Sequence, residues 1–427
     1  MRVRTHRRSP SLCAALLVPV LAAFAAPAQT PREDCQPAWV PTFVGGNSIS
    51  SSVFTQAVFD DGNGEALYVG GGFITAGGQA VNRIARWNGS AWSPLGSDVN
   101  NSVIATAVFN DGNTEALYIG GTFTTVSGQP ITGIARWDGA SWSAVGTGLN
   151  GNVFALGVHD DGTGPALYAG GSFTVAGGAS ANRIAKWNGT TWSPLGGGVE
   201  GSVLALQAFN DGSGDALYVG GSFTFAGGEP VSGIAKWDGS AWSTLASGVG
   251  GGASTPQVRD FAVYDDGTGP ALYAAGLFAS ASATPATSRI ARWDGSAWSS
   301  VGGGITGTGF NQGVYTLSVY DDGSGPGLYA GGDFFAAGGV STSLVARWDP
   351  TGWSPLGAGM QNIDFAPYVR TIGVYDDGAG SGAALFVGGD SVGAPGGGNF
   401  LGKWQGCPIA ETPCPADLTG PALDGIP

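Results

Sequence analysis

Histidine and cysteine are scarce in this chain, and both shortages restrict its chemistry. The 427 residues include two histidines, His6 and His159, and four cysteines. His159 occupies a repeat position that elsewhere holds Phe or Tyr, so we interpret it as a packing residue, which leaves no histidine for a Ser-His-Asp triad. A transition-metal centre needs several converging nitrogen or oxygen ligands, and the sequence indicates no such set. We predict neither a metal nor a cofactor.

Positive charge is also in short supply. Only 17 Lys and Arg stand against 31 Asp and Glu, which gives a formal net charge of −14. Nucleic acids and anionic membranes are bound through clusters of Lys and Arg. The composition therefore argues against both kinds of partner.

Long apolar runs are absent beyond the first 28 residues. Residues 1–28 combine a basic start, an apolar stretch over 12–24 and the small residues Ala26-Pro27-Ala28, which is typical of a secretory signal cleaved near Ala28. No later stretch has the ~18–20 consecutive apolar residues that cross a bilayer. We predict a secreted or cell-surface protein, extracellular or periplasmic, without a membrane span, and we expect a monomer.

Tryptophan, in contrast, is abundant, and it reveals a repeat. Twelve of the 14 Trp residues form six pairs within one recurring segment, which reads IAKWNGTTWSPL at 184–195. Copies follow at 84–95, 134–145, 234–245, 290–301 and 345–356. Each copy predicts two short strands joined by a tight turn. Successive copies are about 50 residues apart, a period that is typical of β-propeller blades.

The two remaining tryptophans lie in complementary halves of this hairpin. Trp404 in LGKWQG matches its first half, and Trp39 in AWVPTF matches its second half. A linear stack of repeats needs polar caps at its ends, whereas a closed ring pairs its first strand with its last repeat and so removes free edges. We therefore predict that the strand of Trp39 pairs with the strand of Trp404.

One repeat unit, over 202–247, predicts four strands at 203–209, 216–223, 233–239 and 241–246, with a loop over 224–232. The first two strands flank an Asp/Asn-Gly turn, in which Asp and Asn bond to their own main chain and Gly accepts a positive φ. Calcium binding by these turns is the alternative. We disfavour it because the acids are adjacent rather than alternating, and Asn110 and Asn210 replace the first acid.

Two further repeat positions have a structural and a functional interpretation each. Strand two ends in Gly-Gly in all but one repeat, which predicts a close approach of another backbone rather than a phosphate site, since no helix or basic residue follows. One Lys or Arg precedes the first Trp of each repeat. These cations could form an anion-binding ring, but we favour pairing with the turn acids or stacking on aromatic faces.

An apolar strand that ends in Gly-Gly, followed by an aromatic residue and a Trp across a D-x-x-x-W-like turn, resembles the kelch repeat. The resemblance covers residues 36–406 in seven units. It implies an all-β, seven-bladed β-propeller with four antiparallel strands per blade, closed by the N-terminal strand that completes the last blade. The loop after Gly-Gly is longer here, and Trp stands where kelch repeats more often have Tyr. The family includes both enzymes and binding scaffolds. Its copper enzymes need histidine ligands that this chain lacks.

The cysteines near the two ends fall at equivalent places. Cys35 lies four residues before Trp39 and Cys407 three residues after Trp404, so both fall in the turn of the reconstituted hairpin. An exported protein permits disulfides. We favour a Cys35–Cys407 bond, and the alternative is Cys407–Cys414. The partner of Cys414 stays open.

The segment 408–427 leaves the repeat. It is Pro-rich and has no strand or helix period, so we expect a disordered tail after a propeller domain over 35–407. Its PADLTG sequence resembles the opening of dockerin-like tails of secreted bacterial proteins. No complete D-x-D-x-D-G pattern follows, and we assign no metal to it.

The loops that connect strand four to the next strand one supply the candidate site. They are short in the early repeats and longer over 247–260, 303–314 and 358–370. In a propeller they share one face with the loops between strands two and three, and such loops often carry function. Neutral loop growth is the alternative, since surface loops tolerate insertion. The candidate binding residues are Arg259, Asp260, Phe310, Asn311, Gln312, Asp364, Phe365, Tyr368 and Arg370.

Three functions remain open at this point. The first is non-catalytic binding of a glycan or an extracellular protein through the longer loops of blades 5–7. The second is a carbohydrate-active hydrolase or lyase that uses acids such as Asp260 and Asp364 on the same face, because paired carboxylates can meet in space without being close in sequence. The third is a purely structural surface protein.

Overall fold

The computed structural model describes residues 35–96, 98–251, 255–282, 284, 286–306, 313–364 and 366–407. The predicted signal segment 1–28 and the tail 408–427 lie outside these residues. The described chain is all-β, apart from the short 3-10 helix η1 (Gly45–Asn47). No described helix is long and apolar enough to cross a membrane.

The main unit of the fold is a four-stranded antiparallel sheet. Sheet 1 contains β2 (Val53–Asp60), β3 (Glu65–Gly71), β6 (Ile84–Trp87) and β7 (Trp92–Pro94), and sheet 2 contains β8 (Val103–Asn110), β9 (Glu115–Gly121), β12 (Ile134–Trp137) and β13 (Trp142–Ala144). Sheet 3 contains β14 (Val153–Asp160), β15 (Pro165–Gly171), β18 (Ile184–Trp187) and β19 (Trp192–Pro194), and sheet 4 contains β20 (Val203–Asn210), β21 (Asp215–Gly221), β24 (Ile234–Trp237) and β25 (Trp242–Ser243). Sheet 5 contains β27 (Gln257–Asp265), β28 (Pro270–Leu277), β30 (Ile290–Trp293) and β31 (Trp298–Ser300), and sheet 6 contains β33 (Val314–Asp321), β34 (Pro326–Gly332), β37 (Val345–Asp349) and β38 (Gly352–Pro355).

A five-stranded sheet follows, which we call the terminal sheet. It contains β40 (Tyr368–Tyr375), β41 (Ala384–Gly393), β42 (Asn399–Gln405), the short β39 (Gln361–Asn362) and, from the start of the chain, β1 (Ala38–Val40). β1 pairs with β42, and Trp39 lies opposite Trp404. The strand pairing expected from the two half-hairpins is therefore present.

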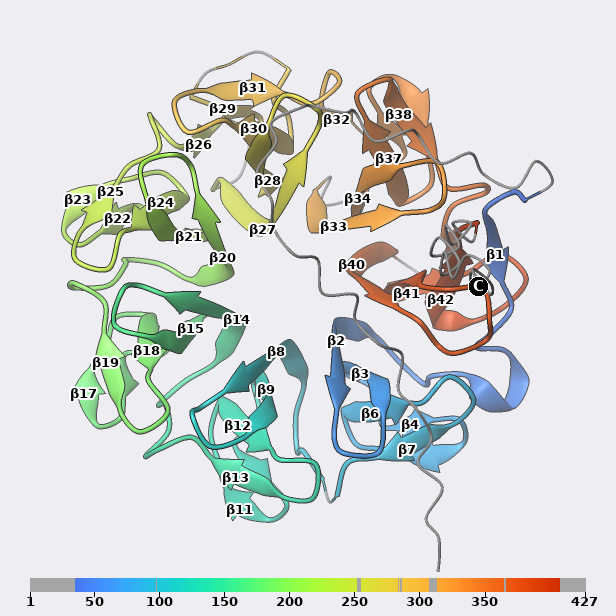
Figure 1. Cartoon of the computed structure of the whole chain (residues 1–427), viewed down its shortest axis with the longest axis horizontal. Coiled ribbons are helices and arrows are strands. Elements are labelled where there is room, and N and C mark those ends of the chain that lie inside the picture. The colour runs from blue at the N-terminus through green and yellow to red at the C-terminus, as the bar shows by residue number, and fades with distance from the viewer. Residues whose placement is uncertain are drawn as a thin grey trace, which may run out of the picture.

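The sheets are arranged around a common axis, with the first strand of each nearest to it (Figure 1). The first strand of each sheet packs against the first strand of the next, and β2 packs against β40. The core lies between neighbouring sheets. One such cluster joins Phe209 and Tyr218 of sheet 4 to Leu272 and Trp298 of sheet 5.

Short two- and three-stranded ribbons stand where the sequence predicted only loops, mostly between strands two and three, with β26 and β32 coming from the segments that precede a first strand. They are β4 (Thr75–Ala76) with β5 (Gln79–Ala80), β10 (Thr125–Val126) with β11 (Gln129–Pro130), β16 (Val175–Ala176) with β17 (Ala179–Ser180), β22 (Phe225–Ala226) with β23 (Glu229–Pro230), β26 (Val249–Gly250) with β29 (Ser280–Ala281), and β32 (Ile305–Thr306) with β35 (Ala336–Ala337) and β36 (Val340–Ser341).

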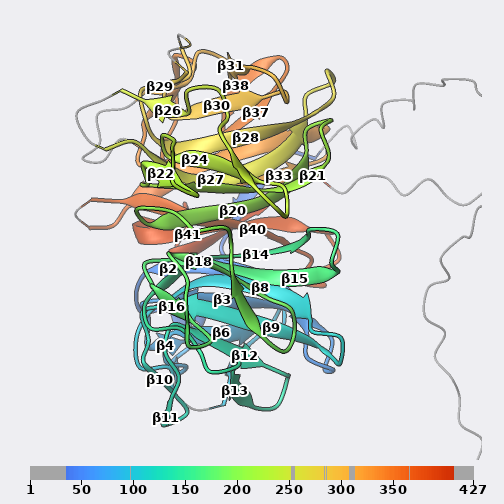
Figure 2. The same cartoon turned by 90° about the vertical axis from the view of Figure 1, so that its left-hand side faces the viewer.

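These ribbons mark one face of the molecule. Figure 2 shows them gathered at one end of the axis. Bridges such as Val99 to Val126 and Leu149 to Ala176 attach the loops that enter each first strand to the ribbons. The two sets of loops therefore share a face, as predicted. We call it the ribbon face.

The tryptophans hold adjacent sheets together. The Nε1 of Trp142 donates to the carbonyl oxygen of Leu95 in the preceding repeat at 2.8 Å, and the same bond recurs along the chain. Trp39 makes the equivalent bond to the oxygen of Leu356 at 2.9 Å. Trp39, from the start of the chain, thus links the terminal sheet to the preceding repeat in the way that a fourth-strand Trp links each other sheet.

The Gly-Gly pairs have the packing role that the sequence predicted. A Cβ on Gly170 would lie 2.3 Å from Cγ1 of Val203 in the next sheet. A Cβ on Gly171 would lie 2.0 Å from the carbonyl oxygen of Asn152 in the neighbouring strand of its own sheet. Neither glycine has a positive φ, so lack of space rather than backbone conformation requires glycine.

The repeated cations pair with the second acid of each turn, which confirms the structural interpretation. The nitrogen-to-oxygen distances are 2.5–3.8 Å in the pairs Arg86–Asp61, Arg136–Asp111, Lys186–Asp161, Lys236–Asp211, Arg292–Asp266, Arg347–Asp322 and Lys403–Asp377.

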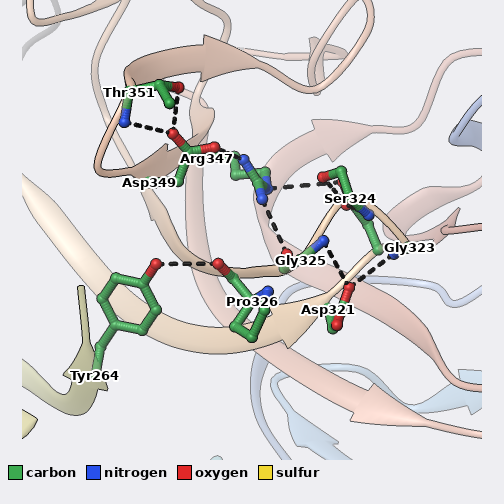
Figure 3. A network of polar contacts seen from close by, with 10 residues as sticks. Tyr264, Asp321, Gly323, Ser324, Gly325, Pro326, Arg347, Asp349 and Thr351 are labelled. Atoms are coloured by element: carbon green, nitrogen blue, oxygen red, sulfur yellow. Dashed lines mark hydrogen bonds and ion pairs between the residues drawn. The ribbon is translucent and has the colours of Figure 1, made fainter. Parts of the chain in front are cut away.

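Figure 3 shows one of these networks, in sheet 6. Asp321 accepts hydrogen bonds from the backbone N–H groups of Gly323 at 2.9 Å and Gly325 at 3.0 Å, so the acid closes its own turn. Arg347 donates to the Gly325 oxygen at 3.0 Å and pairs with Asp349. Tyr264 of sheet 5 donates to the oxygen of Pro326 at 3.0 Å and so links the two sheets.

The predicted disulfide between the ends of the repeat region is confirmed. Cys35 and Cys407 are bonded, with their Cα atoms 5.7 Å apart and a sequence separation of 372 positions. The backbone N–H of Cys407 also donates to the oxygen of Asp322 at 2.7 Å, which ties this end to sheet 6. Cys414 lies outside the described residues.

Candidate functional site

A cavity of about 480 Å³ lies on the axis, and the first strand of every sheet contributes to its wall. Each contribution comes from the same place in the strand, among its second to fourth residues. Because the wall is built from a repeated position, we call this space the axial cavity. Its lining can be compared sheet by sheet.

A β-bulge in each first strand explains why these side chains reach the axis. In β20 the pairing with β21 shifts between Val203 and Ala205, which leaves Leu204 as the extra residue. The same shift occurs in all the other first strands. A bulge interrupts the ladder and redirects the side chain of its extra residue. Here that side chain lines the axial cavity.

The bulge residue changes character between the early and the late sheets. It is apolar in sheets 1 to 4, where it is Phe54, Ile104, Phe154 and Leu204. In sheets 5 and 6 and the terminal sheet it is polar, namely Arg259, Tyr315 and Arg370. The cavity therefore has an apolar half and a cationic, aromatic half. The repeat alone does not require this division.

The cationic half is a compact cluster of planar groups. Tyr315 stacks on Tyr368, with ring centroids 5.4 Å apart and planes at 20°. The Cζ of Arg259 lies 5.3 Å from the centroid of Tyr315, and that of Arg370 lies 5.5 Å from the same ring and 4.5 Å from Tyr368. Stacking on aromatic faces stabilises a guanidinium and fixes its plane.

The two arginines differ in their counter-charges. Arg370 is paired, because its Nε lies 2.7 Å from Oδ2 of Asp390. Among the described residues Arg259 forms no ion pair, and its buried Nε has no hydrogen-bond partner. Burial lowers the pKa of Arg259, and the nearby charge of Arg370 acts in the same direction. A guanidinium nevertheless keeps its proton at neutral pH.

Asp260 follows Arg259 but faces a different neighbour. Its Oδ2 accepts the backbone N–H of Leu317 in sheet 6 at 2.8 Å, and its Oδ1 accepts its neighbour Phe261 N–H at 2.8 Å. Burial raises the pKa of this carboxyl to about 6, although the two backbone hydrogen bonds act to lower it. Asp260 therefore joins two first strands at the wall of the cavity.

The raised pKa of Asp260 predicts a pH dependence of stability. The native carboxyl keeps its proton up to a pH near 6, whereas an unfolded Asp loses it near its ordinary value, so the native state binds more protons between these values. Unfolding free energy should consequently fall by on the order of 2 kcal/mol as pH rises through this window. Asp260→Thr introduces the residue found at the equivalent position of sheet 6, Thr316. In this variant the unfolding free energy should no longer fall over this pH range. Denaturant unfolding of both proteins at pH 4 and 7.5 checks this, and parallel pH profiles would contradict it.

The structure corrects the expected location of four candidate residues. Arg259, Asp260, Tyr368 and Arg370 were predicted on loops, but they lie in β27 and β40, and all except Tyr368 line the axial cavity. The physical reason is that the last residues of each long segment already pair with the second strand of the sheet, across the bulge.

The other candidate residues are not brought to the cavity wall, or cannot be placed. Tyr368 lies in β40 and joins the cluster through its ring contacts. Asp364 is exposed and is not one of the residues that line the cavity. Four candidates lie outside the described residues: Phe310, Asn311, Gln312 and Phe365.

Sequence reasoning missed Tyr315 and the apolar half of the cavity. A signal for both was present, because the residue directly after the first Val of each repeat is apolar in four repeats and Arg, Tyr and Arg in the others. In the described part of the chain no group of three or more His, Cys, Asp or Glu residues could hold a metal ion. What the cavity offers is recognition by guanidinium groups, aromatic rings and apolar surface.

Comparison with known proteins supports the fold. No protein-family model and no curated protein sequence matches the chain. Among solved structures, it is similar to the extracellular domain of a putative one component system from B. thetaiotaomicron, with a TM-score of 0.50 and 11% identity over 86% of this chain and 39% of that one. It is also similar to an ancestral GH74 enzyme, with a TM-score of 0.50 and 16% identity over 87% of this chain and 48% of that one. The chain thus spans less than half of either structure. Together with the sheets described above, these likenesses indicate a propeller-like all-β protein.

Proposed function

We propose that residues 35–407 form an exported seven-bladed propeller of the kelch type, in which the N-terminal strand completes the last blade. Three observations support closure: β1 pairs with β42, β2 packs against β40, and the Cys35–Cys407 disulfide joins the two ends. The disulfide also suits an oxidising compartment. In this proposal residues 1–28 are a cleaved signal and 408–427 are a dockerin-like tail or a spacer.

We further propose that the protein is a non-catalytic binding module for a glycan or an extracellular protein, and that the axial cavity receives the recognised group. One observation carries this proposal. At a single repeat position the chain departs from apolar residues in three successive sheets and places two arginines and a tyrosine together. Packing needs no such change, since Phe or Leu fills the same position in the other sheets.

The hydrolase or lyase alternative has less support. Both carboxylate oxygens of Asp260 accept backbone hydrogen bonds, and the one from Leu317 joins β27 to β33, which is a structural task. The other proposed acid, Asp364, lies away from the cavity wall. The likeness to a GH74 enzyme concerns the fold alone at this level of identity. If a substrate is found, retained turnover in Asp260→Thr and Asp364→Ala would eliminate the enzyme hypothesis.

Substitutions borrowed from neighbouring repeats test the binding proposal with little risk to the fold. Arg259→Leu gives sheet 5 the residue of sheet 4, and Arg370→Phe gives the terminal sheet the residue of sheet 1. The matched control is Arg183→Gly, which also removes one positive charge, borrows the glycine found at positions 133 and 233, and does not line the cavity.

The screen is a glycan array together with a panel of extracellular proteins. We expect a ligand whose affinity falls at least tenfold in Arg259→Leu and in Arg370→Phe, since loss of a charge-assisted hydrogen bond costs about 1.5–3 kcal/mol. Arg183→Gly should retain the affinity of the unmodified protein. A ligand whose affinity is unchanged in both cavity variants would place the site elsewhere and refute the proposal.

A further inference from the structure

The axial cavity holds one positive charge that the protein leaves uncompensated. Arg370 is balanced by Asp390, and both oxygens of Asp260 are occupied by backbone N–H groups. Arg259 has neither a carboxylate partner among the described residues nor a hydrogen bond at its buried Nε. A charge removed from water without a partner is costly, and a bound anion would offset that cost.

The apolar half of the wall, which begins at Phe54 with its ring centroid 5.4 Å from the Cζ of Arg370, imposes a second requirement on the ligand. Phe54, Ile104, Phe154 and Leu204 present only carbon atoms to the cavity. A hydroxyl-rich sugar would receive no hydrogen bond from these four side chains, and the neighbouring hydroxyl groups of Thr55 and Thr106 already bond to each other at 2.8 Å, so its burial here is unfavourable. An apolar group would gain from burial there, at roughly 25 cal/mol per Å².

The charge around the cluster favours a monoanion. Asp390 already pairs with Arg370, so a dianion such as a phosphate monoester would bring a second negative charge that only Arg259 could offset. A carboxylate has one charge, and its two oxygens match the planar donor fork of a guanidinium. The cavity volume of about 480 Å³ lies in the range of small-molecule sites, which is about 300–1,000 Å³.

We propose that the axial cavity binds a carboxylate joined to a compact apolar group, with the carboxylate on Arg259 and the apolar group against Phe54, Ile104, Phe154 and Leu204. This inference rests on the proposed binding function and narrows it. The same chemistry occurs in a free aliphatic or aromatic acid and in the C-terminus of a peptide that ends in an apolar residue. A neutral glycan is disfavoured.

The test uses matched probes on residues 29–427 with the disulfide intact, by isothermal titration calorimetry at pH 7. The probes are 4-phenylbutyrate, its neutral amide 4-phenylbutanamide, and D-glucuronate, which carries a carboxylate on a polar body. We expect 4-phenylbutyrate to bind at least tenfold more tightly than either of the others, and at least tenfold more weakly to Arg259→Leu. Arg183→Gly should stay within twofold of the unmodified protein. A Phe-terminated tripeptide, compared with its C-terminal amide, then distinguishes a peptide from a free acid as the source.

The outcomes separate this inference from the function on which it rests. Absence of 4-phenylbutyrate binding, equal affinity for the acid and the amide, or equal affinity for glucuronate would overturn the inference. The binding function would survive any of these results if a ligand from the array loses affinity in Arg259→Leu. If 4-phenylbutyrate binds but Arg259→Leu leaves its affinity unchanged, the position proposed for the carboxylate is wrong.

Discussion

Replacing Cys35 and Cys407 by Ser should lower the free energy of unfolding by up to about 5 kcal/mol. The bond connects residues 372 positions apart, so it restricts most of the unfolded chain, and the stabilisation by a disulfide increases with loop length. The bond also holds β1 beside β42. Denaturant unfolding of the double variant and of the unmodified protein, both without reductant, measures the loss.

Cys414→Ser is the control for this prediction. If Cys414 has no part in the structural disulfide, this variant should unfold at the same denaturant concentration as the unmodified protein. A loss in Cys414→Ser as large as that of the double variant would indicate a Cys407–Cys414 bond and would contradict the pairing of the two ends.

Gly171→Ala should destabilise the protein by on the order of 3 kcal/mol, because overpacking forces the backbone to move. The added Cβ would lie 2.0 Å from the oxygen and 3.0 Å from the carbon of the Asn152 carbonyl, and also 3.0 Å from the Cα of Val153. All of these are backbone atoms of β14 or its entry, which cannot rotate away as a side chain could. Thermal or denaturant unfolding measures the effect.

The matched control is Gly250→Ala. Gly250 also has an ordinary φ, and a Cβ there meets nothing within 4 Å. We expect it to change stability by less than about 0.5 kcal/mol. If Gly171→Ala proved as mild as Gly250→Ala, the close approach of the two strands would not be what requires glycine.

The repeat itself supports the asymmetry between the two glycines of each pair. The first is replaced once, by Ala275, whereas the second is Gly in every repeat. Around the second glycine the nearest carbonyl oxygen would always lie 1.9–2.1 Å from an added Cβ. The second glycine faces backbone atoms, which impose the same steric constraint in each sheet. The first glycine faces side chains, which can move to accommodate an added Cβ.

Much of the fold could be predicted because its determinants are local and repeated. The Trp pairs, the turn acids and the Gly-Gly pairs each recur with a fixed spacing, and the two half-hairpins indicated that Trp39 meets Trp404. The ribbons such as β22 and β23 were not predicted, because strands of two residues are too short to produce an alternating pattern. They are stabilised by contacts to the entering loop, which the sequence does not display.

The candidate site was predicted only in part, and for a reason that proved incomplete. Loop length drew attention to the residues before β27 and β40, and so to Arg259, Asp260 and Arg370. Loop length says nothing about register, however, and the bulge places these residues on strands at the axis. Tyr315 was missed because it becomes apparent only when the repeats are compared at the bulge position rather than by the length of their loops.

The central claim is that the two ends of the chain meet in one sheet, where β1 pairs with β42. The most direct measurement is mass spectrometry of a non-reduced digest of the protein. A cross-linked pair of peptides that contain Cys35 and Cys407 is the predicted result. A Cys407–Cys414 link with a free Cys35 would contradict the account.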